Sequence, residues 1–126
     1  MHTELHEKQG GFIPDNAYFQ NGKLVLKLNN RPSHNRPYSS GEYRTNNTFS
    51  YGTFETNMIA AKGDGLVTSF FLYTGMNAPY GKKMPSHPMQ IMVNLWPGTG
   101  VDSWLNHFWY SGEKYAYYDY IKYTPK

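Results

Sequence analysis

Two tryptophans and an asparagine carry the side chains of this sequence that are best suited to chemistry with sugars. Trp96 and Trp104 lie eight residues apart around a turn rich in glycine and proline, and Asn94 precedes Trp96 by two positions. An indole stacks its flat face on a sugar ring, and an amide hydrogen-bonds the ring hydroxyls. Asn94 and Trp96 share one face of an extended segment, because side chains alternate along a strand. The pattern indicates a carbohydrate-binding surface, with core packing of the tryptophans as the alternative.

Two further pairs of side chains have the i, i+2 spacing that puts both members on one face of a strand. Glu42 and Arg44 form the first pair, and Phe71 and Tyr73 form the second. Charged and aromatic groups on one face suit contact with a ligand. The alternatives are a surface ion pair, which contributes at most about 1 kcal/mol, and a buried aromatic pair.

The elements that would position these side chains are strands. Alternating apolar and polar residues predict strands at residues 23–28, 50–61, 66–74, 89–96 and 114–123, with a short extended piece at 42–45. The turn at 62–65 predicts that 50–61 and 66–74 form a β-hairpin. The pattern contains no convincing helix and no internal repeat. We therefore expect an all-β fold in which antiparallel sheets stack as a sandwich.

A single domain is expected from the length of 126 residues. Twelve glycines and eight prolines separate the β-type runs, which is typical of an all-β domain. Residues 1–16 show no clear period, so we expect a loose N-terminal arm there, with a hinge at residues 10–11. The folded domain is then expected to span residues 17–126.

Composition argues against several classes of protein. The net charge is only +3 and the basic residues are dispersed, which disfavours a nucleic-acid partner. No apolar run approaches the roughly 20 residues that a membrane helix needs. The start of the chain is polar and lacks the apolar core of a signal peptide, so none is expected there. The absence of cysteine excludes a disulfide, a thiolate metal site and a cysteine nucleophile.

Several blocks of the sequence, in a fixed order, carry a family resemblance. Residues 19–26, 40–62, 69–75, 92–105 and 118–123 resemble the bacterial lichenases, the endo-β-1,3-1,4-glucanases of glycoside hydrolase family 16. The resemblance implies a concave jelly-roll sandwich, retaining hydrolysis of mixed-linkage β-glucan, a β-glucan polysaccharide or oligosaccharide as partner, and secretion. It also implies that the binding cleft contains Glu42, Arg44, Phe71, Tyr73, Trp96 and Trp104. Asn94 joins them because a side-chain amide in mid-strand needs a hydrogen-bond partner, which a sugar hydroxyl would supply.

The resemblance breaks between residues 75 and 89. In the family, the segment after the Tyr-Thr-Gly block leads to a strand that reads Glu-Ile-Asp-Ile-Glu, which carries the catalytic carboxylates. Here, residues 76–88 lead directly to the strand containing Asn94 and Trp96. The chain therefore resembles a family member of reduced strand number. The sheet edges exposed in this way would favour a homo-oligomer.

The missing strand matters because retaining glycosidases need two carboxyl groups about 5–5.5 Å apart. None of the nine acidic residues has another acidic residue two positions away. Glu42 and Glu55, from different strands, remain as candidates for a catalytic pair. We expect a glucan-recognising protein without catalysis. The alternatives are an active glycosidase with carboxylates recruited from other strands and an engineered or truncated minimal sandwich with no ligand.

The resemblance also implies a structural calcium ion on the convex side, although no cofactor is expected to be required. Asp119 matches the position of a calcium ligand, and the backbone carbonyl of Gly22 matches another. One carboxylate with several carbonyls is a reasonable calcium site. The alternative is that Asp119 is a hydrogen-bonded residue of the sheet.

Overall fold

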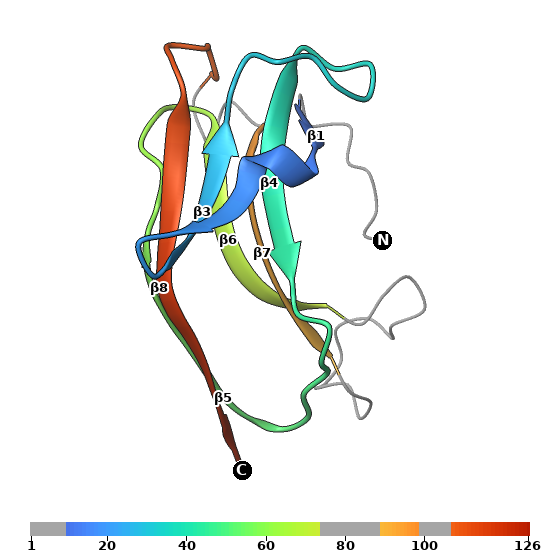
Figure 1. Ribbon diagram of the computed structural model, residues 1–126, viewed down its shortest axis with the longest axis vertical. Coiled ribbons are helices and arrows are strands. Elements are labelled where there is room, and N and C mark those ends of the chain that lie inside the picture. The colour runs from blue at the N-terminus through green and yellow to red at the C-terminus, as the bar shows by residue number, and fades with distance from the viewer. Residues whose placement is uncertain (1–9, 74–88, 99–106) are drawn as a thin grey trace.

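The computed structural model describes residues 10–73, 89–98 and 107–126, in which two β-sheets form the two layers of a sandwich (Figure 1). Strands β1, β4, β7 and β6, in that order, make one sheet, which we call sheet A. Strands β2, β3, β8 and β5 make the other, sheet B. The predicted all-β sandwich is confirmed. The elements are β1 (Gly10–Phe12), η1 (a 3-10 helix, Pro14–Asn16), β2 (Ala17–Gln20), β3 (Lys23–Leu28), β4 (Tyr38–Arg44), β5 (Gly52–Ile59), β6 (Leu66–Tyr73), β7 (Gln90–Pro97) and β8 (Lys114–Pro125).

The centre of each sheet is a long antiparallel strand. In sheet A, β7 pairs with β4 on one side and with β6 on the other, and β1 adds to β4 in parallel. In sheet B, β8 pairs with β3 and β5. The β2–β3 hairpin turns at Asn21 and Gly22, whose φ angles of 53° and 78° suit these two residue types. Among the described strands, β5 and β6 are edge strands of their sheets. Pairing of a second copy of the chain with these edges stays a prediction.

The hydrophobic core lies between the two sheets. Alternation along β3 and β7 turns one face of each strand inward, as the sequence predicts. Burial of one such leucine contributes about 1.5–3 kcal/mol. The buried cluster comprises Leu24, Leu26, Leu28, Val93, Leu95, Phe108, Ala116 and Tyr118.

A glycine on β4 allows close packing of the N-terminal elements. A Cβ atom built on Gly41 would lie 2.3 Å from the carbonyl oxygen of Asn16 and 3.1 Å from the backbone nitrogen of Lys27. Both neighbours are backbone atoms, which cannot rotate away as a side chain can. The contact therefore requires glycine, and it fixes η1 against β4.

The predicted hairpin between 50–61 and 66–74 is wrong. β5 pairs with β8 in sheet B, whereas β6 pairs with β7 in sheet A. Residues 60–65 carry the chain across the roughly 10 Å that separates packed sheets. Alternation along β5 is as predicted, with Phe54 and Met58 half-buried and Glu55 exposed, but alternation alone does not select the partner strand.

The expected arm at residues 1–16 needs a correction over its second half. Residues 10–12 form β1, and residues 14–16 form η1. Asn16 is buried, and its Nδ2 donates a hydrogen bond of 3.0 Å to the carbonyl oxygen of Ser39. This bond ties the segment to β4. Residues 1–9 lie outside the described residues, and no helix within the described part is long and apolar enough to cross a membrane.

Candidate functional site

The outer face of sheet A, which points away from sheet B, collects the side chains singled out in the sequence. Val93 and Leu95 of β7 point into the core, so Asn94 and Trp96 point outward. Strand register then aligns Glu42, Asn94 and Ser69 in one row across β4, β7 and β6. The next row consists of Arg44, Met92 and Phe71.

Trp96 is held in place by its neighbour on the same strand. Its indole Nε1 donates a hydrogen bond of 3.1 Å to Oδ1 of Asn94, which also accepts a hydrogen bond from Oγ of Ser69. The indole is half-buried, and Asn94 is only 3% exposed. Asn94 was expected to contact a sugar hydroxyl. The structure gives its oxygen two partners within the protein, through which Asn94 orients the indole, and the contact with a sugar hydroxyl stays a prediction.

Arg44 and Tyr73 come together although they lie on β4 and β6. The guanidinium carbon of Arg44 lies 5.9 Å from the centre of the Tyr73 ring, within the range of a cation–π interaction. The hydroxyl of Tyr73 is buried and has no hydrogen-bond partner among the described residues. Arg44 and Tyr73 therefore form an aromatic and cationic patch beside the row that contains Asn94.

Glu42 and Glu55 do not form a catalytic pair. Glu42 is on β4 of sheet A, and its neighbour Tyr43 points between the sheets, so Glu42 points outward. Glu55 is exposed on β5 of sheet B, opposite Lys122 of β8. The two carboxylates thus project from opposite sides of a sandwich whose layers are roughly 10 Å apart. That separation exceeds the about 5–5.5 Å that a retaining mechanism needs.

Gly22 and Asp119, the calcium ligands that the resemblance implies, lie close together, and the ammonium group of Lys23 lies beside Asp119. Gly22 and Asp119 line the same hollow, and Nζ of Lys23 lies 3.8 Å from Oδ1 of Asp119. The described residues contain no group of three or more carboxylates, histidines or cysteines that could hold a metal. Calcium requires six to eight oxygen ligands. The described donor set does not fit calcium, and the ion stays a prediction.

All candidate binding residues within the described part of the chain lie on the outer face of sheet A. Trp104 lies outside the described residues. Sequence reasoning missed Ser69, whose hydroxyl bonds to Asn94. The signal was available, because Ser69 precedes Phe71 by two positions and so shares its face. Brought together on this face are Glu42, Arg44, Phe71, Tyr73, Asn94 and Trp96.

Comparison with known proteins agrees with this architecture. The family model described as "Glycosyl hydrolases family 16" matches residues 10–80. A β-glucanase from Paenibacillus polymyxa is 30% identical over 178 residues, covering 87% of this chain and 74% of the relative. A β-glucanase from Acetivibrio thermocellus is 31% identical over 179 residues, covering 89% of this chain.

The chain is shorter than the proteins it matches. It spans about half (54%) of the length of the A. thermocellus protein, and the 179 matched positions exceed its own 126 residues. The relative therefore has positions without a counterpart here. The fold is nonetheless shared with the crystal structure of a prokaryotic β-1,3-1,4-glucanase (lichenase) from a mouse hindgut metagenome, with a TM-score of 0.85, 24% identity, and coverage of 95% of this chain and 88% of that one. The chain belongs to glycosyl hydrolase family 16.

Proposed function

We propose that the outer face of sheet A binds a chain of mixed-linkage β-1,3-1,4-glucan and does not hydrolyse it. The observation that carries this proposal is the hydrogen bond from Trp96 to Asn94, which holds an indole in one orientation on an outward face. A fixed aromatic plane binds a sugar ring with little loss of side-chain entropy. The β-glucanase names of the two relatives support the choice of ligand.

Each group on this face has a role in the proposal. Trp96 stacks on one glucosyl ring, and Phe71 and Tyr73 on β6 extend the apolar surface to the neighbouring ring. Glu42 and Arg44 on β4 hydrogen-bond the hydroxyls along the edge of the rings. Stacking on one aromatic side chain contributes about 1–3 kcal/mol, by analogy with nucleic-acid bases.

The positions of the carboxylates support the proposal of binding without hydrolysis. The sequence has no Glu-x-Asp-x-Glu segment. Glu42 is the one candidate acid on this face among the described residues, and Glu55 lies on the other sheet. A single carboxylate can hydrogen-bond a sugar, but it cannot act as both nucleophile and acid/base in a retaining mechanism. Because the ligand is a polysaccharide, we also propose that the protein acts outside the cell.

The test compares two tryptophans, the half-buried Trp96 and the exposed Trp109. Trp96→Ala should weaken binding of a mixed-linkage tetrasaccharide, measured by isothermal titration calorimetry, by about 5- to 150-fold, since the loss of one stacking contact is about 1–3 kcal/mol. Trp109→Ala serves as the control, because Trp109 is 65% exposed but does not belong to sheet A. Its binding should equal that of the parent.

Three outcomes would overturn the proposal. The first is a parent that does not bind the tetrasaccharide. The second is equal binding by the parent and Trp96→Ala. The third is release of reducing sugar from mixed-linkage β-glucan by the parent and not by Glu42→Gln, which would establish a catalytic site with a carboxylate recruited from elsewhere.

A further inference from the structure

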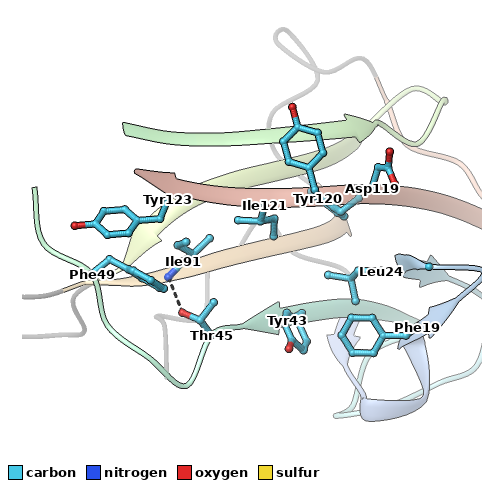
Figure 2. Close-up of a pocket in the computed structure, with 12 residues that line it drawn as sticks. Phe19, Leu24, Tyr43, Thr45, Phe49, Ile91, Asp119, Tyr120, Ile121 and Tyr123 are labelled. Carbon is cyan, nitrogen blue, oxygen red and sulfur yellow. Dashed lines mark hydrogen bonds between the residues drawn. The ribbon is translucent and has the colours of Figure 1, made fainter. Parts of the chain in front are cut away.

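A hollow of about 520 Å³ lies between the two sheets, on the inner side of sheet A (Figure 2). Its walls come from β2, β3, β4, β7 and β8, together with Gly22, Thr45 and Phe49. Tyr43 of β4 points into it, on the opposite face of the strand from Glu42. The hollow is therefore separate from the outer face of sheet A.

Aromatic rings flank the hollow at two places. Phe19 and Tyr43 meet edge to face, with ring centres 5.5 Å apart and planes at 84°. Phe49 and Tyr123 form a second pair, with ring centres 4.8 Å apart. Figure 2 shows these two pairs on either side of Ile91 and Ile121. Such an arrangement leaves room for a further ring between the pairs and offers it both ring faces and ring edges.

Two of these rings are more exposed to solvent than aromatic side chains that pack in a hydrophobic core. Phe19 is 69% exposed and Tyr43 is 38% exposed. Large apolar side chains that are exposed next to a concave apolar surface mark ligand sites more often than ordinary surface. A molecule seated in the hollow would cover both rings and remove their apolar area from water.

The carboxylate of Asp119 and the hydroxyl of Thr45, which both line the hollow, already have partners within the protein. Asp119 is the one charged side chain among the described lining residues, and the ammonium group of Lys23 lies 3.8 Å from it. The hydroxyl of Thr45 accepts a hydrogen bond from the backbone nitrogen of Ile91 and donates one to the carbonyl oxygen of Asn47. The hollow thus has no unmatched charge to attract an ion.

We propose that this hollow binds one neutral, flat aromatic molecule of two or three rings. Pockets that enclose a molecule of drug-like size have volumes of about 300–1,000 Å³ and are mostly apolar, as this one is. The two aromatic pairs favour a planar ring system over a flexible acyl chain. The site takes a ligand of a different class from a sugar and does not depend on the glucan-binding face.

The test uses the neutral fluorescent probe N-phenyl-1-naphthylamine with the full chain. We expect a saturable rise in probe fluorescence with one site per chain. Tyr43→Ala should raise the Kd about three- to tenfold, the equivalent of one aromatic contact. Ile121→Phe should fill part of the hollow and abolish binding while leaving the Tm equal or higher. Ile59→Ala is the control, because Ile59 is 57% exposed and does not line the hollow.

Each contrary result is decisive. If the parent gives no saturable signal, or if Tyr43→Ala binds the probe as the parent does, the proposal is wrong. If the fluorescent fatty acid cis-parinaric acid binds more tightly than the aromatic probe, the hollow is an acyl-chain site and the aromatic assignment is overturned. Tyr43→Ala keeps the test valid even if Ile121→Phe fails to fold, because the Tyr43 ring is partly exposed.

Discussion

Asn94 and Trp96 are adjacent on the outer face of β7, and a hydrogen bond of 3.1 Å from the indole Nε1 to Oδ1 of Asn94 links them. Because the same oxygen also accepts a hydrogen bond from Ser69 on β6, the orientation of the indole depends on two strands. The stacking surface is thus built into the sheet and does not belong to a loop. This relationship makes Asn94 a positioning residue.

Asn94→Ala should therefore reduce tetrasaccharide affinity without removing a sugar contact. The indole nitrogen and the Ser69 hydroxyl lose their common acceptor, at a cost of about 1–3 kcal/mol in the free energy of unfolding. Tryptophan fluorescence anisotropy should fall as the indole gains freedom, and calorimetry should show weaker binding. Asn57→Ala, an exposed change on β5, is the matched control. If Asn94→Ala keeps the tetrasaccharide affinity and the fluorescence anisotropy of the parent and only its Tm is lower, Asn94 has a purely structural role.

Gly41→Ala should destabilise the fold strongly. The added methyl group would lie 2.3 Å from the carbonyl oxygen of Asn16, so η1 must move away from β4. Overpacking of this kind costs about 1–3 kcal/mol, and the backbone contact argues for the upper end. Urea unfolding measures the loss. Thr53→Ala, on the exposed face of β5, should change the stability by less than about 0.5 kcal/mol. A loss of that small size in Gly41→Ala would contradict the close contact.

Stability should fall above pH 10 because of buried tyrosine. Burial raises the pKa of Tyr118 above its ordinary value of 10, and its hydroxyl donates a hydrogen bond of 2.7 Å to the carbonyl oxygen of Ser69. The Tyr115 hydroxyl donates a hydrogen bond to the carboxylate of Glu113. This bond, as the largest cause, and burial, as the next, raise the pKa of Tyr115 to about 12. Above pH 10 the unfolded chain loses these protons while the folded chain keeps them, so rising pH favours unfolding.

The pH effect is checked by urea midpoints between pH 7 and 11. Tyr118→Phe should lower the stability at pH 7 by about 1 kcal/mol through the lost hydrogen bond. It should also show a shallower decline above pH 10, with the remaining slope carried in part by Tyr115. An identical slope for the parent and Tyr118→Phe would show that Tyr118 is not the titrating group.

Removal of calcium should leave the domain folded. The ammonium group of Lys23, 3.8 Å from Asp119, supplies the positive charge that a calcium ion would otherwise bring. We expect the same Tm, within about 1 °C, in EGTA and in millimolar calcium. Asp119→Asn should behave alike in both buffers. A calcium-dependent rise of several degrees that Asp119→Asn eliminates would instead establish the calcium site implied by the family resemblance.

Local patterns in the sequence predict strands well, but not their partners. The strand at 23–28 was predicted with the bounds of β3, because its leucines alternate and a turn precedes it. Val25, on the opposite face of the strand from these leucines, is nevertheless only 2% exposed. Its cross-strand neighbours Tyr18 and Tyr117 come from other parts of the sequence. The same limit explains the wrong hairpin, since the choice of β8 and β7 as partners depends on contacts far along the chain.

The candidate site shows the same division between local and distant information. The i, i+2 spacing predicts Glu42 and Arg44 on one face of β4 and Phe71 and Tyr73 on one face of β6, and the strand register confirms both pairs and puts them on the same face of sheet A. The row from Glu42 through Asn94 to Ser69 joins three strands that are distant in sequence. Only the register aligns them, and no local pattern encodes a register across such distances.

The pairing of Tyr73 with Gln90, at the ends of β6 and β7, has a consequence for the number of residues that the chain can hold between them. The two ends of sheet A at which residues 74–88 leave and return are neighbours across one ladder step. Because closing a longer loop between fixed neighbouring ends costs little additional entropy, material can be added or lost at this position without changing the rest of the sheet. A change in the number of residues between these two paired ends should therefore leave the register of β6 and β7 intact.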